Sequence, residues 1–345
     1  MNNLKVIFLL LGVLLVGSVV LSISMGAVSI PPREALRMVL YRVPVVSGLI
    51  ADGDVDGTRL TIVGDIRLPR IVLALLVGAA LSIAGAVMQG LFQNPMADPY
   101  IVGISSGAAL GATIALIGKI NFWFAGLSSV PLLAFAGALS VTFLVYGISV
   151  RGGKVPVAML LLTGIAVGAL ATAITSFLMV TGGQDLYQVI FWIMGSLSAR
   201  RWDHVGMILP YVVVGFVLVQ LYARDLNVML LGEEPAQHLG VHVEQVKIIL
   251  LTVASLLAAS AVAVSGIIGF VGLVVPHMMR MVVGPDHRRL LPASFLAGGI
   301  LMVLADVLAR TVIAPTEIPI GIITSLLGCP FFLFLLVRRR DTAFL

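Results

Sequence analysis

The feature that most constrains this 345-residue chain is a series of ten long apolar runs. A run of about 20 apolar residues crosses the roughly 30 Å hydrocarbon layer as a helix, in which each backbone amide finds a partner within its own segment. Only 11% of the residues are charged, whereas a soluble domain has about 25%. The sequence therefore predicts an all-α, polytopic membrane protein with ten transmembrane helices. The runs fall near residues 5–27, 69–92, 99–118, 128–149, 156–180, 203–223, 246–265, 267–283, 291–310 and 318–337.

The seventh and eighth runs follow each other with almost no polar linker. Together they are too long for one membrane-spanning helix, so we expect a break at Ser265-Gly266, with Gly269 close behind. The first run is long for the apolar core of a signal peptide, and no convincing small-x-small cleavage site follows it. We interpret the first run as an uncleaved span.

An even number of spans places both chain termini on the same side of the membrane. Arg338-Arg339-Arg340 favour a cytoplasmic C-terminus, because cytoplasmic loops are enriched in basic residues. The basic residues of the whole chain divide almost evenly between the two sides. Beyond this cluster, the enrichment of basic residues in cytoplasmic loops therefore gives almost no indication of orientation. We expect both termini in the cytoplasm and one transmembrane domain over residues 1–345, with a long outer loop at 28–68.

A faint internal repeat relates two parts of the chain. Moving the second run by 181 positions places Gly85 on Gly266, and Pro95 on Pro276. Five spans separate the copies and an odd number reverses direction, so the pattern is typical of the inverted repeats of transporters. Matches among small residues are common in membrane sequences, and the repeat alone is a weak signal.

The stretch QGLFQNPMADPYIVG at residues 89–103 interrupts the apolar pattern with a stiff, polar bend. Pro95 and Pro99 each disfavour helix at the residue before them. Asn94 and Asp98 carry side chains that cap helices or bond the backbone of turns. A plain turn between two spans explains these residues. Small residues on both sides favour close helix packing or a wall without bulky side chains; they include Gly78, Gly85, Gly90, Gly103 and Gly107.

The bend belongs to a series of motifs that runs from about residue 60 to 337. They are Arg67–Arg70, Val77–Gln89, Asn94–Pro99, Trp192–Ser196, Leu231–Gly240, Gly269–His277, Asp286–Arg288 and Glu317–Gly321. In these motifs the chain resembles the permease family that imports iron–siderophores, haem and vitamin B12, and it is particularly similar to the vitamin B12 branch.

The resemblance implies the ten-span fold of type II ABC importer permeases, in the cytoplasmic (inner) membrane. It implies a subunit that works by alternating access, pairs with itself and binds two copies of an ATPase subunit, on which ATP and Mg are held. A periplasmic or lipid-anchored binding protein would deliver the cargo. Membrane lipid would surround the chain, and no nucleic acid partner and no cofactor of its own are expected. The chain itself would not be an enzyme.

The resemblance also implies roles for particular residues. Asn94, Pro95 and Met96 match the cytoplasmic gate, and Val157 and Ala158 match a second constriction, where the vitamin B12 branch has small hydroxyl residues. A segment at about 225–246 matches the coupling region, two short helices seated in a groove of the ATPase. Its candidate residues are Gly232, Glu233, Glu234, Gln237, His238, Leu239 and Gly240. A plain surface loop is the alternative for this segment.

Arg67, Arg70 and Arg310 match positions that pair with glutamates of the binding protein in the family. Headgroup anchoring is the alternative, and for Arg310 so is an ion pair with Asp306, four residues earlier. Positions that would line the passage are Gly164, Gly168, Thr172, Gly321 and Ser325. Close helix packing is the alternative at the glycines.

Residue patterns limit the other functional classes. The chain has no GxxxxGK[ST] phosphate loop, so ATP hydrolysis must come from a partner. An ion-coupled secondary transporter of a small solute is the main alternative. Such carriers usually need a carboxylate near the membrane midplane, and the sequence has none in the middle of a predicted span. His238 and His242 have no third ligand nearby, so we predict no metal site. No constellation typical of an intramembrane enzyme is present.

Overall fold

The computed structural model describes residues 2–26, 30–41, 57–124, 126–150, 152 and 154–342. Within these ranges, seven helices are long and apolar enough to cross a membrane and three shorter apolar helices accompany them, which confirms the ten predicted positions. The seven are α1 (Asn2–Ser24), α5 (Leu68–Leu91), α7 (Ser129–Ser149), α8 (Val157–Thr181), α10 (Trp202–Leu221), α13 (Val243–Ser265) and α15 (His287–Thr311). The three shorter ones are α6 (Ile104–Ile117), α14 (Val271–Val283) and the apolar part of α16 (Ile320–Thr342).

Short elements connect these spans. They are α2 (Pro32–Tyr41), α4 (Gly57–Thr61), the π-helical segment η2 (Ile62–Arg67), the 3-10 segments η3 (Pro99–Val102) and η4 (Gly183–Asp185), α9 (Leu186–Ile193), α11 (Ala223–Met229) and α12 (Glu233–His238). Two short strands, β1 (Trp123–Phe124) and β2 (Leu127–Ser128), pair antiparallel and form a hairpin before α7.

Helix α5 forms the centre of the fold, since it packs against α10, α13, α14 and α15 and most of its residues are buried. Two of its glycines permit very close approach. A Cβ atom on Gly78 would lie 2.1 Å from the carbonyl oxygen of Gly298 in α15, and one on Gly85 would lie 1.8 Å from that of Gly272 in α14. Neither distance leaves room for a methyl group. The predicted close packing of this glycine-rich span is therefore confirmed.

The predicted break between the seventh and eighth spans is also confirmed. Helix α13 ends at Ser265, and Gly266 has a φ of +70°, which L side chains rarely adopt. Helix α14 begins at Val271. The residues aligned by the internal repeat, however, differ in local structure: Pro95 lies in the turn after α5, whereas Pro276 lies inside α14. The alignment does not place these prolines at equivalent positions.

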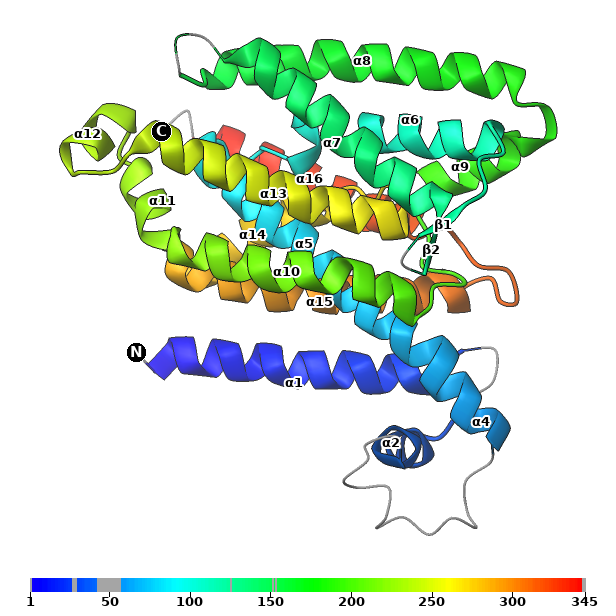
Figure 1. The fold of residues 1–345 in the computed structure, drawn as a ribbon. Coiled ribbons are helices and arrows are strands. Elements are labelled where there is room, and N and C mark those ends of the chain that lie inside the picture. The colour runs from blue at the N-terminus through cyan, green and yellow to red at the C-terminus, as the bar shows by residue number, and fades with distance from the viewer. Residues whose placement is uncertain are drawn as a thin grey trace.

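The bundle has two distinct ends (Figure 1). Both termini lie at the end that carries α11 and α12, as an even number of spans requires. We call this the α12 end. The opposite, hairpin end carries β1, β2, α2 and α4. The predicted outer loop, 28–68, is at the hairpin end where the structure describes it, and residues 28–29 and 42–56 of that loop lie outside the described residues.

Candidate functional site

The segment predicted for coupling, residues 225–246, projects from the α12 end (Figure 1). It contains two short helices, the end of α11 and all of α12, followed by the start of α13. From Leu231 to Gly240 only Ala236 is buried, and the apolar side chains of Leu231 and Leu239 are 66% and 64% exposed. Exposed large apolar groups beside polar ones are typical of an interaction surface. We call Leu231, Glu234, Gln237, His238 and Leu239 the α12 surface.

Glu233 differs from its neighbours on α12, because its carboxylate faces back into the protein. Its Oε1 lies 2.6 Å from Nζ of Lys247 in α13. The residue before it, Gly232, has a φ of +111°, so the chain turns sharply into α12 at a position that favours glycine. All of the predicted coupling residues except Gly232 are exposed, and Glu233, although its side chain is 46% exposed, also binds within the chain.

The predicted gate residues lie in the turn that follows α5, which we call the inner turn (residues 92–98). The side chain of Asn94 accepts a hydrogen bond of 2.9 Å from the backbone N–H of Met96. That of Asp98 accepts one of 2.8 Å from the N–H of Tyr100 and caps η3, which confirms its expected capping role. Burial raises the pKa of Asp98 to about 6, against the lowering effect of the Tyr100 N–H. Side chains of the turn thus bond to its own backbone and to that of η3.

The inner turn is attached to α11. Gln93 donates a hydrogen bond of 2.6 Å to the carbonyl oxygen of Met229, the last residue of α11. Asn227, also in α11, donates to Asp286 at 2.6 Å and accepts from the backbone N–H of His287 at 2.8 Å. Helix α11 is therefore fastened on one side to the inner turn and on the other to the start of α15.

The second predicted constriction lies next to the first. Val157, the first residue of α8, lines a narrow crevice with Leu91 and Phe92 at the end of α5. Ala158 is exposed. Both segments that the sequence connects with gating are therefore brought together at the α12 end.

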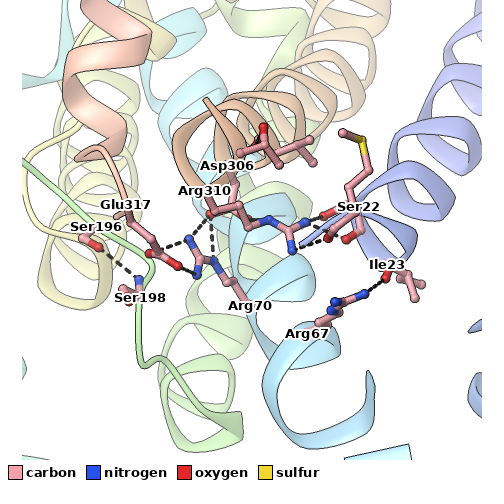
Figure 2. Close-up of polar contacts among 12 residues, drawn as sticks. Ser22, Ile23, Arg67, Arg70, Ser196, Ser198, Asp306, Arg310 and Glu317 are labelled. Atoms are coloured by element: carbon pink, nitrogen blue, oxygen red, sulfur yellow. Dashed lines mark hydrogen bonds and ion pairs between the residues drawn. The ribbon is translucent and has the colours of Figure 1, made fainter. Parts of the chain in front are cut away.

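The arginines predicted for docking are at the hairpin end, and each has a partner within the chain (Figure 2). Arg70 in α5 contacts Asp306 of α15 at 2.8 Å and Glu317 at 2.8 Å. Asp306 also pairs with Arg310 at 3.4 Å, which confirms the ion pair expected from their spacing. We call Arg70, Asp306, Arg310 and Glu317 the charge cluster. It joins α5, α15 and the segment before α16.

Contacts with α1 extend the charge cluster. Arg310 donates to the carbonyl oxygens of Ser22 and Met25 at 2.6 and 2.9 Å. Arg67 is 5% exposed and donates to the carbonyl oxygen of Ile23. Burial alone would raise the pKa of Glu317, but its hydrogen bonds with Arg70 hold that pKa below the ordinary value. These partners give all three arginines a role in joining helices; their direct contact with a binding protein stays a prediction.

Comparison with known proteins shows which family the chain belongs to. The sequence pattern of the FecCD transport family matches residues 14–338. The chain belongs to that family. It is 48% identical over 332 residues to the cobalamin import system permease protein BtuC of Halobacterium salinarum, covering 93% of this chain and 88% of that protein. It is 46% identical over 283 residues to the hemin transport system permease protein HmuU of Yersinia pestis, covering 80% and 83%.

A solved structure agrees with the family. A protein described as a metal-chelate type ABC transporter, in an inward-facing conformation, matches with a TM-score of 0.83 at 31% identity, over 97% of this chain and 99% of that one. This FecCD-family chain is therefore a multi-pass membrane permease of the ABC importer type. It is a transport subunit and not an enzyme, because ATP hydrolysis in such importers takes place on a separate subunit.

The residues predicted to line the passage of this FecCD-family chain do not all face open space. A Cβ atom on Gly164 would lie 2.2 Å from the carbonyl oxygen of Ile101, and one on Gly321 would lie 2.3 Å from that of Met194. These two glycines allow close packing. Thr172 is exposed and donates to the carbonyl oxygen of Gly168 at 2.9 Å, and Ser325 is half-buried. Helix α8 packs on α6 and α7, and α16 packs on α14 and α15, so the two helices predicted to line the passage have different neighbours within one chain.

Sequence reasoning missed the structural roles of Lys247 and Gln93. In the sequence, Lys247 is a basic residue at the start of an apolar run and Gln93 is part of the polar bend. One signal was available: Glu244 precedes Lys247 by three residues, a spacing at which helical side chains of opposite charge meet. No local pattern indicates that Gln93 reaches Met229, since 136 residues separate them.

Proposed function

We propose that this chain imports a metal ion enclosed in an organic chelate or macrocycle, such as a cobalamin, a haem or an iron–siderophore. Relatives at 48% and 46% identity are named for cobalamin and hemin import, and the matching structure for a metal chelate. These cargoes share a bulky ligand around a central metal. They are too large for a narrow ion path, and a carrier that opens alternately to either side suits them.

The observation that carries the proposal is the α12 surface at the end of the bundle where both termini lie. An ATPase subunit seats on this surface, with Leu231 and Leu239 as apolar anchors and Glu234 and Gln237 beside them. Aliphatic side chains that are 66% and 64% exposed are stabilised when a partner covers them. The α12 end then faces the cytoplasm, where ATP is available, and the membrane is the cytoplasmic one.

A second copy of the chain covers α8. Besides large apolar side chains such as Phe177, at 69% exposure, the open face of α8 presents small and hydroxyl residues; they include Ala166, Ala169, Thr172, Ala173 and Ser176. Exposed α1, by contrast, presents mainly Leu and Val. A face that mixes small and hydroxyl residues with large apolar ones fits a helix that lines a passage between two chains better than one that faces only lipid.

Cysteine crosslinking tests the pairing. Cys329 is the only cysteine and is exposed, so it is first replaced by serine. Phe177→Cys on α8 should then give an oxidised dimer in membranes, whereas Val13→Cys on the lipid-facing side of α1, at 61% exposure, should not. Equal crosslinking at both positions would contradict the pairing through α8.

A binding protein docks at the hairpin end and delivers the cargo. The charge cluster lies beneath this surface and holds α1, α5 and α15 in register, so its arginines shape the docking site. A rigid surface keeps complementary charges of the two proteins in place, and such complementarity sets the rate and register of docking.

Transport in proteoliposomes tests the function. The chain is reconstituted with its own ATPase and binding protein, and uptake of cyanocobalamin, haemin and a ferric siderophore is measured with and without ATP. We expect ATP-dependent uptake of one cargo class. Uptake by the chain alone, driven by a proton or sodium gradient, would instead support an ion-coupled carrier and contradict the proposal.

A further inference from the structure

A buried lysine connects the coupling segment to the start of α8. Lys247 lies in the first turns of α13 and its side chain is 4% exposed. Its Nζ lies 2.6 Å from Oε1 of Glu233 in α12 and 3.3 Å from Oε1 of Glu244 in α13. One ammonium group thus holds carboxylates from both helices.

The contacts continue from Glu244 to the segment before α8. The second carboxylate oxygen of Glu244, Oε2, accepts a hydrogen bond of 2.9 Å from the backbone N–H of Val155. Val155 is 2% exposed and lies two residues before Val157, where α8 begins. A continuous series of polar contacts therefore runs from α12 through Lys247 and Glu244 to the predicted second constriction.

The same lysine lies beside the first gate segment, because both line one crevice. Its side chain lines the crevice formed by Leu91, Phe92, Val155 and Val157. Lys247 is thus placed between α12, the inner turn and α8, and a shift of any one of them changes its surroundings.

We infer that Lys247 is a positioning residue, which transmits movement of α12 to the inner turn and the start of α8. This inference rests on the proposed function, in which an ATPase moves α12. The ammonium group of Lys247 is buried, so separating it from its carboxylates would leave a charge without a partner inside the protein. The contacts of Lys247 therefore stay intact when the ATPase moves α12, and α12, α13 and Val155 shift together.

The role differs from simple structural support in what its loss changes. A supporting residue sets how much folded protein there is, while a transmitting residue sets how much cargo moves for each ATP hydrolysed. The test is therefore the ratio of ATP hydrolysed to cargo taken up, measured on folded, reconstituted complexes.

Lys247→Met keeps the aliphatic chain and removes the charge, and Lys247→Arg keeps the charge. We expect Lys247→Met to raise the ATP-to-cargo ratio by about fivefold or more, the lower end of typical coupling energies, and Lys247→Arg to restore most of the coupling. Lys154→Met is the matched control, because Lys154 is an exposed lysine near the start of α8. It should leave the ratio unchanged.

Glu233→Gln covers the case in which Lys247→Met does not fold, since it leaves Lys247 paired with Glu244. It should raise the same ratio, with the folded fraction close to that of the wild type. If the wild-type complex transports and both Lys247→Met and Glu233→Gln keep its ATP-to-cargo ratio, the inference is wrong and the proposed function stands. If the wild-type complex shows no ATP-driven uptake of any cargo, the proposed function fails first.

Discussion

Gln93 in the inner turn donates a hydrogen bond of 2.6 Å to the carbonyl oxygen of Met229 at the end of α11. The gate predicted from sequence and the helix that leads into α12 are therefore in direct contact. Through Lys247, a second route reaches the start of α8. Both predicted gate segments are joined to the part of the chain that we expect a motor subunit to hold.

Gln93→Ala should weaken transport while leaving the fold intact. A single neutral hydrogen bond contributes about 1 kcal/mol to stability, but here it joins the gate to α11. We expect cargo uptake to fall by about fivefold or more at nearly unchanged melting temperature. Gln245→Ala, at an exposed position of α13, is the control. Equal uptake by the two variants would show that the Gln93 contact is not used.

Arg70→Met should destabilise the protein strongly, because it leaves Asp306, with a side chain 1% exposed, without its nearest cation. Removing one partner of a buried pair costs about 3–5 kcal/mol. The control is Arg59→Gln, whose pair with Glu34 is exposed at 40% and 45% and should contribute about 0–1 kcal/mol. Thermal unfolding in detergent compares them, and similar melting temperatures would mean that the charge cluster does not hold the helices together.

Gly85→Ala should prevent α5 and α14 from packing as they do, since its Cβ would meet a carbonyl oxygen at 1.8 Å. We expect a loss of about 3 kcal/mol, at the upper end of overpacking effects, or failure to assemble. Gly17→Ala in α1, where no atom lies within 4 Å of the new Cβ, should be tolerated. Monodispersity and melting temperature in detergent separate these outcomes, and a wild-type-like Gly85→Ala protein would disprove the packing.

Asp98 should make stability depend on pH. Its pKa is raised from 3.8 to about 6, so the folded state binds the proton more tightly than the unfolded state does. The resulting stability is present below pH 3.8 and is lost as the pH rises through about 6. Asp98→Asn keeps the capping oxygen without the charge, so its melting temperature should exceed that of the wild type by a margin that grows from pH 4 to pH 7. A difference in melting temperature that stays constant from pH 4 to pH 7 would contradict the raised pKa of Asp98.

The positions of the spans could be predicted because length and apolarity decide them within one segment. The break at Ser265-Gly266 could also be predicted, since glycine punctuates helices locally. Other features could not. The short apolar helix α9 and the hairpin formed by β1 and β2 are too short to be recognised as membrane-spanning runs. Arg67, Arg70 and Arg310 have partners that are far away in sequence, apart from Asp306 for Arg310. Glu233 and Lys247 lie on two different helices, so no spacing within one helix indicates their contact.

The family resemblance supplied the candidate site residues, and the structure shows where each of them lies. It brings Asn94, Pro95, Met96 and Val157 to the same end of the bundle, where the inner turn contacts α11 and lies near the start of α8. It assigns Gly164 and Gly321 to close packing. In the pairing that we propose, the residues that touch cargo depend on how two chains meet, and no local pattern in the sequence indicates that arrangement.

The central claim is that an ATPase subunit binds the α12 surface. The direct measurement is the binding affinity of the purified ATPase for the detergent-solubilised chain, compared with that for a Leu231→Ser/Leu239→Ser variant. These side chains are exposed, so the variant should fold normally. Two buried Leu side chains contribute about 1.5–3 kcal/mol each at an interface, and we predict binding at least tenfold weaker with an unchanged melting temperature. Unchanged affinity would mean that the motor binds elsewhere and that the account is wrong.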